Sequence, residues 1–123
     1  MEDCPFCDLD RVIIEQTTHM RLIKSRYPVI EDGHFLIVPR RHVESCYDFT
    51  SAEWFEAKQL IKSARAEGNR RLGLVDSNVG FNDGLFAGQS IFHAHIHVIM
   101  RKPGDVENPR GGIRNVIPSK GCY

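Results

Sequence analysis

The sequence predicts an α+β domain in which a largely antiparallel sheet packs with one long helix. Strand-like segments lie on both sides of one clear helical segment, and no repeat or long linker divides the chain. With 123 residues, 41% of them hydrophobic, the chain can bury one core. We therefore expect a single domain over 1–123, in which about 104–123 form a mostly irregular tail rich in glycine and proline.

Two strands are expected before the helix. Residues 20–24 are short, partly alternating and moderately strand-like. Residues 34–38 form a firmer apolar run, which Pro39 closes.

The helix has a complete start signal. Thr50 can cap it, Glu53 completes a capping box, and Phe49 and Trp54 occupy the two positions of a hydrophobic staple. Apolar residues then recur at helical spacing, and Gly68 suits the end of the helix.

The segment after the helix is expected to return as two strands. Residues 75–81 suggest a strand that leads into the glycine-rich loop 82–88, and a further strand spans about 91–100. Because alternate side chains of a strand lie on opposite faces, His93, His95 and His97 should share one face.

This row holds half of the six histidines in the chain, so it is poorly explained as a set of ordinary structural residues. One metal cannot easily bind all three, since the ends of the row, His93 and His97, are about 13 Å apart in a strand. An imidazole acting as a nucleophile on phosphorus, with neighbours that donate protons or hydrogen bonds, fits the row better. Upstream, the amides of Asn82 and Gln89 and the hydroxyl of Ser90 can hold phosphate oxygens.

Two of the four cysteines form a Cys-Pro-Phe-Cys unit at Cys4 and Cys7, while Cys46 and Cys122 stand alone. A redox C-x-x-C would follow a strand and open a helix, but no strand precedes this unit. The pattern therefore favours half of a metal site.

Charge and hydropathy exclude other classes. Sixteen basic and sixteen acidic residues balance, which opposes a nucleic-acid partner. The acidic start lacks the apolar region of a signal peptide, and no apolar run approaches the roughly 20 residues of a membrane span. We expect a cytoplasmic protein with no membrane partner.

Three segments together resemble the histidine triad (HIT) family of nucleotide hydrolases and transferases, in its zinc-containing bacterial-type branch. These segments are 33–42, 82–84 and 88–97, and the resemblance extends over about residues 4–101. It implies the α+β histidine triad fold, a sheet extended across a homodimer, and reaction at the α-phosphate of a nucleotide. It also implies that His95 is the nucleophile, which forms a covalent nucleotidyl-histidine.

The resemblance assigns the other site residues as well. His97 and Ser90 would assist phosphate oxygens or the leaving group, and Asn82 would hold phosphate. Zinc-binding members imply a closed structural site, with one zinc per chain, at positions that match Cys4, Cys7, His42 and His93. No organic cofactor is expected.

Two features leave alternatives open. Ser25 or Arg26 falls where many family members carry an acidic residue that grips the ribose. Arg110 or Arg114 of the basic C-terminal segment either belongs to a solvated tail or approaches the distal phosphates of the substrate.

The leading hypothesis is a hydrolase that cleaves dinucleoside polyphosphates or related adenylate conjugates at the α-phosphate. A nucleoside phosphoramidase with the same mechanism and a non-catalytic nucleotide-binding protein are the alternatives. A zinc-finger-like nucleic-acid module built on Cys4 and Cys7 is opposed by the zero net charge.

Overall fold

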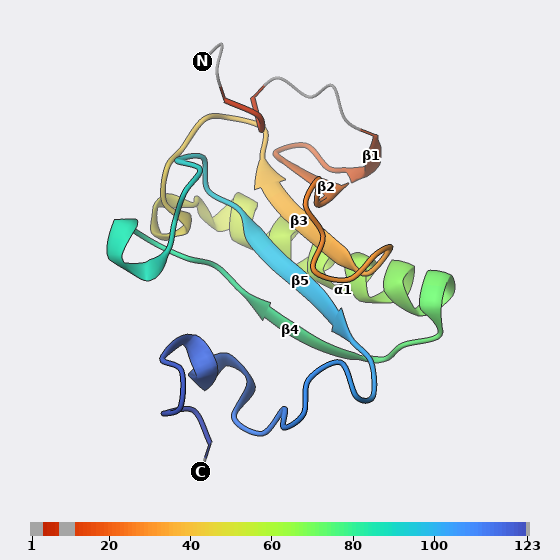
Figure 1. The fold of residues 1–123 in the computed structure, drawn as a ribbon. Helices are drawn as coiled ribbons and strands as arrows, with labels where there is room; N and C mark the ends of the chain where they lie inside the picture. The colour runs from red at the N-terminus through yellow and green to blue at the C-terminus, as the bar shows by residue number, and fades with distance from the viewer. Residues whose placement is uncertain (1–3, 8–11, 123) are drawn as a thin grey trace.

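The computed structural model describes residues 4–7 and 12–122, and over these it confirms the α+β prediction. Helix α1 (Ser51–Leu72) lies across one face of a five-stranded antiparallel sheet with the order β1-β2-β3-β5-β4 (Figure 1). The strands are β1 (Ile13–Gln16), β2 (Met20–Lys24), β3 (His34–Pro39), β4 (Asp76–Gly80) and β5 (Ile96–Arg101). Strand β1 was not predicted, because its four residues are mostly exposed and do not alternate between apolar and polar.

The start of α1 agrees with its sequence signal. Thr50 and Glu53 form the capping box, and the rings of Phe49 and Trp54 meet with centroids 5.0 Å apart. The helix passes the predicted end at Gly68 and stops before Gly73, whose φ of 71° is left-handed. Gly68 is instead a packing residue, since a Cβ there would collide with the side chain of Met100.

The two faces of the sheet have different roles. The face toward α1 carries the main core, which includes Met20, Leu22, Phe35, Ile37, Leu60, Ile96, Val98 and Met100. On the other face a smaller cluster joins Cys4 and Phe6 of the N-terminal segment to Ile23, Leu36 and Val38. The N-terminal segment therefore covers part of the face opposite the helix.

The predicted strand over 91–100 is too long at its start. Strand β5 begins at Ile96, so His93 and His95 precede it. The N–H of Ala94 donates to the carbonyl of Val43, in the segment that follows β3, at 2.7 Å. The chain is thus held against that segment before it joins the sheet, and strand alternation does not describe His93.

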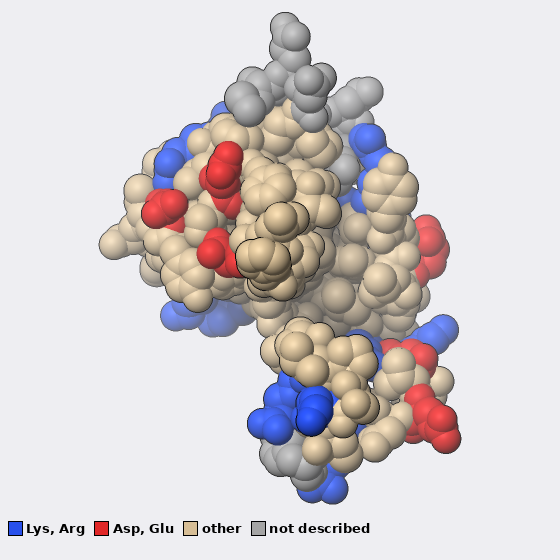
Figure 2. All heavy atoms as spheres, turned by 60° about the vertical axis from the view of Figure 1, so that its left-hand side comes forward, with Lys and Arg blue, Asp and Glu red and all other residues tan. Residues whose placement is uncertain are grey.

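The C-terminal segment returns along β4 and contains a short 3-10 helix, η3 (Gly112–Val116). A Cβ on Gly80 would contact Ile113 at 3.8 Å, which places η3 beside the end of β4. Figure 2 shows basic side chains gathered on this segment, and Arg114 donates to the carbonyl of Gly121 within it. None of the described helices combines the length and hydropathy that crossing a membrane requires.

Candidate active site and metal centre

Cys4, Cys7, His42 and His93 bring four ligand atoms together, all within 4.8 Å of one another. The Nδ1 atom of His93 lies 3.4 Å from each of the two Sγ atoms and 3.2 Å from Nδ1 of His42. The Sγ atom of Cys7 lies 3.2 Å from Nδ1 of His42. In a tetrahedral zinc site with bonds of about 2.0–2.3 Å, neighbouring ligand atoms are about 3.3–3.8 Å apart. The cluster therefore has the size and donor set of a structural zinc site.

The protonation of these groups also suits a cation. The Nε2 atom of His93 lies 2.9 Å from the carbonyl oxygen of Pro39 and donates to it, which leaves the lone pair of Nδ1 facing the thiols. Burial and the neighbouring Cys4 thiol raise the pKa of Cys7, so ionising it is costly unless a cation lies beside it. The residues present thus fit zinc.

Phe6 connects this cluster to the histidines that follow. It lies between the two cysteines in the chain and is buried. Its ring centroid is 5.8 Å from that of His93 and 5.1 Å from that of His95. A metal that fixes the N-terminal segment would therefore also fix the packing around His95.

His95 is held in the form that a nucleophile needs. Its Nδ1 atom donates to the carbonyl oxygen of His93 at 2.9 Å, so Nε2 keeps a free lone pair. Burial lowers the pKa of His95, which keeps the ring neutral.

His97 is held in the opposite tautomer to His95, with its proton on Nε2. The N–H of Val29 donates to Nδ1 of His34, so a neutral His34 carries its proton on Nε2. That proton is donated to Nδ1 of His97 at 2.9 Å, which leaves the proton of His97 on Nε2 as a free donor. Burial, and then the neighbouring His95 and His34, lower the pKa of His97 to about 4.

His34 is the residue that the sequence analysis missed. It lies within the segment 33–42 that resembles the HIT family, but the resemblance assigned it no role. Its position on a strand two residues before Leu36 was the available signal, because both then face away from the helix. Only the structure shows that the ring of His34 reaches His97, which lies opposite Leu36 in the pairing of β3 with β5.

A cavity of about 370 Å³ collects most of the predicted catalytic and binding groups. Its lining includes Phe6, Ser25, Arg26, Tyr27, His34, Asn82, Ser90, His95 and His97. A nucleophilic nitrogen, an N–H donor, an amide and a hydroxyl thus share one space. This combination can attack phosphorus and stabilise the charge that develops on its oxygens.

Gln89 does not line this cavity, although it was predicted to hold phosphate. It is only 4% exposed, and its Oε1 accepts from the N–H of Gly84 at 2.8 Å. Its amide nitrogen donates to the carbonyls of Glu44 and Ile91. Both ends of the side chain are therefore engaged in shaping the loop that carries Ser90.

Comparisons with known proteins agree with this arrangement. Protein hit of Bacillus subtilis (strain 168) is 32% identical over 108 residues, which cover 81% of this chain and 72% of that protein. The asymmetrical bis(5'-nucleosyl)-tetraphosphatase of Schizosaccharomyces pombe is 33% identical over 73 residues, or 59% of this chain, and the match spans only 40% of that protein.

A solved structure of a Zn-bound histidine triad family protein from Mycobacterium smegmatis superposes with a TM-score of 0.72 at 28% identity. The match covers 85% of this chain and 78% of that one. The family model for the HIT domain matches residues 8–104, which is most of the chain. The chain therefore belongs to the HIT family.

Proposed function

We propose that this protein is a nucleotide hydrolase that cleaves its substrate at the α-phosphate through a nucleotidyl group on His95. One observation carries the proposal: the free Nε2 lone pair of His95 and the free Nε2–H of His97 belong to one cavity. The first can bond to phosphorus, and the second can donate to an oxygen of the same phosphate.

In the first step the Nε2 atom of His95 bonds to the α-phosphorus, and the bond from phosphorus to the leaving group breaks. In the second step water attacks the same phosphorus, the N–P bond breaks, and the mononucleotide is released. His97, Ser90 and Asn82 hold the phosphate oxygens in both steps. Gln89 supports the loop beneath them through its internal hydrogen bonds.

We propose dinucleoside polyphosphates and related adenylate conjugates as the substrate class. The tetraphosphatase of Schizosaccharomyces pombe, which is similar over part of its length, supports this class. Nucleoside phosphoramidates are the alternative within the same mechanism. Mass spectrometry of the products from a panel of both kinds of compound separates these possibilities, and binding without any product identifies a non-catalytic protein.

We also propose one structural zinc per chain at Cys4, Cys7, His42 and His93. A closed set of four protein ligands leaves no open position for a substrate. The metal would hold the N-terminal segment, and with it Phe6, against His95. The chemical step itself is assigned to the histidines.

Replacing Ser90 with Ala is expected to reduce turnover by about 10²–10³-fold, the usual loss when one donor to a developing oxyanion is removed. The mononucleotide product should still bind, because Asn82 and His97 remain. Steady-state kinetics of Ser90→Ala against Ser63→Ala, a change on helix α1, measures this loss. Equal turnover of the two variants would show that Ser90 does not act on the phosphate.

A homodimer is the second structural proposal, with contacts from the start of α1 and from the strand before Asn82. Large apolar side chains are exposed there: Phe55 is 63% exposed, and Trp54 and Val79 are also partly exposed. Light scattering at micromolar concentration should give twice the 14.0 kDa mass of the chain. Phe55→Asp should shift this mass toward the monomer, whereas Val12→Asp, beside the opposite edge strand, should not. A 14.0 kDa species for the unmodified chain would contradict the dimer.

A further inference from the structure

A second cavity, of about 310 Å³, adjoins the cavity that contains His95. His34, Asn82 and His97 line both cavities. These shared residues include the donors that the proposed mechanism places around the α-phosphate. A group attached to that phosphate can therefore extend into the second cavity, which we call the apolar chamber.

The walls of this chamber come from separate parts of the chain. Val29 follows β2, Ile99 belongs to β5, and Ile113 and Val116 belong to η3. Val29, Ile113 and Val116 are 71%, 56% and 74% exposed, so their side chains are not buried in a core. Apolar groups from distant segments thus border one hollow beside the catalytic histidines.

The described lining of the chamber offers a charged ligand amide and imidazole groups but no cation. No Lys, Arg, Asp or Glu is among its described lining residues. Its two histidines are neutral, since burial lowers the pKa of both His34 and His97. Several phosphate charges placed here would lose hydration without gaining a cation.

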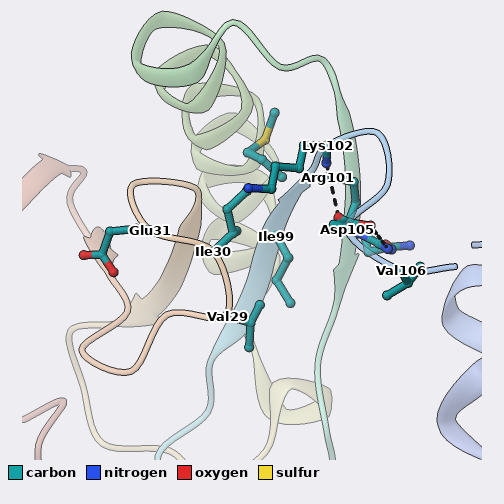
Figure 3. A pocket seen from close by; sticks show the side chains of 10 residues that line it. Val29, Ile30, Glu31, Ile99, Arg101, Lys102, Asp105 and Val106 are labelled. Carbon is teal, nitrogen blue, oxygen red and sulfur yellow. Dashed lines mark hydrogen bonds and ion pairs between the residues drawn. The ribbon is translucent and has the colours of Figure 1, made fainter.

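Arg26 lines the cavity that contains His95, and further cationic groups line a third cavity, of about 520 Å³, which shares Val29, Asn78 and Ile99 with the chamber (Figure 3). There Arg101 forms two hydrogen bonds of 2.7 Å with Asp105, which offsets its charge. Lys102 lines this third cavity and not the chamber. Arg101 also donates to Oδ1 of Asn78, which lines both cavities, so its guanidinium is already engaged.

We propose that the apolar chamber is the subsite for the leaving group, and that it selects nucleotide conjugates whose leaving group is apolar and uncharged. This inference rests on the proposed hydrolase function, and among the substrates proposed there it favours adenylate conjugates and phosphoramidates over dinucleoside polyphosphates. His95 bonds to phosphorus, and the leaving group departs with the electrons of its bond to phosphorus and takes up a proton. One water then attacks the phosphorus, the N–P bond to His95 breaks, the mononucleotide is released, and the proton lost by this water balances the one that the leaving group took up.

Two matched substrates test the proposal: the adenosine 5'-phosphoramidates of benzylamine and of 4-carboxybenzylamine. They share the scissile P–N bond and differ by one remote carboxylate. The unmodified protein should show a kcat/KM roughly tenfold or more higher for the benzylamine compound, because the carboxylate would be desolvated without a partner. Equal values for the two compounds would overturn the proposal.

Val116→Lys places a cation in the chamber and should reverse this preference. Ile117→Lys is the control, because Ile117 is the next residue, is also exposed, and does not line the chamber. The affinity for AMP should be unchanged in both variants. If Val116→Lys and Ile117→Lys gave the same ratio between the two compounds, the leaving group would not contact Val116.

Calorimetry measures how tightly each compound binds to the His95→Ala variant. Because this variant should not cleave either compound, the measurement tests the leaving-group subsite independently of catalysis. The benzylamine compound should bind more tightly than the carboxylated one even though neither is cleaved. If the unmodified protein cleaves neither compound nor any other conjugate while this difference persists, the hydrolase proposal fails and the subsite stands. If cleavage occurs without any difference in affinity or rate, the subsite fails and the hydrolase proposal stands.

Discussion

His95→Ala is expected to abolish turnover of every substrate that the unmodified protein cleaves, with a loss on the order of 10⁴-fold or more. In the proposed mechanism the nucleophilic nitrogen is Nε2 of this ring, and no other described imidazole in the cavity has a free lone pair. The equivalent nitrogen of His97 carries a proton, and both nitrogens of His34 are engaged. Single-turnover kinetics with quantified mononucleotide measures the loss.

Nucleotide binding should survive the same substitution, because Asn82, Ser90 and His97 still line the cavity. His19→Ala is the matched control, since His19 is exposed and pairs with Glu56 on the surface. The control should keep its activity. Near-normal turnover by His95→Ala would assign the chemistry to another group.

Cys4→Ser is expected to release the metal and to lower the melting temperature. Elemental analysis of the unmodified protein, purified without chelators, should give about one zinc per chain. Loss of a ligand breaks a cluster that joins the N-terminal segment to the residues before β5, and metal binding is coupled to folding. Each kcal/mol lost lowers the melting temperature of a domain of this size by roughly 3–6 °C.

Cys122→Ser supplies the control for this experiment. Cys122 is a free and exposed cysteine near the other end of the chain, so its replacement should change neither zinc content nor melting temperature. The zinc proposal fails if the unmodified protein contains no metal. It also fails if Cys4→Ser keeps both its zinc and its stability.

The sequence predicted the parts of the fold that local chemistry determines. The start of α1 was correct, because the cap at Thr50 and the staple of Phe49 and Trp54 involve neighbours in the chain. The end of α1 was wrong, because the reason for Gly68 is a contact with Met100, which is distant in sequence. The start of β5 was wrong for a similar reason, since the bond between Ala94 and Val43 depends on tertiary packing.

In the site, too, the features that depend on tertiary contacts were the ones that the sequence analysis did not predict. The resemblance to the HIT family named the four residues of the candidate metal centre, and the structure brings all four together. It did not identify His34, whose partner His97 lies 63 positions further along the chain. The donor groups of the glycine-rich loop had also placed Gln89 among the phosphate ligands, whereas the structure shows its amide engaged within the loop. The tautomers of the histidines follow from such bonds and cannot be deduced from spacing.

The most direct test of the central claim is to trap the intermediate. The protein is mixed with an adenylate conjugate and quenched within a fraction of one turnover in alkaline denaturant, because N–P bonds to histidine are acid-labile. Mass spectrometry of the digested protein should then find the mass of a nucleotidyl group on the peptide that contains His95. Fragmentation should place the group on this residue. Finding it on a different residue, or finding no adduct while the product forms at full rate, would contradict covalent catalysis by His95.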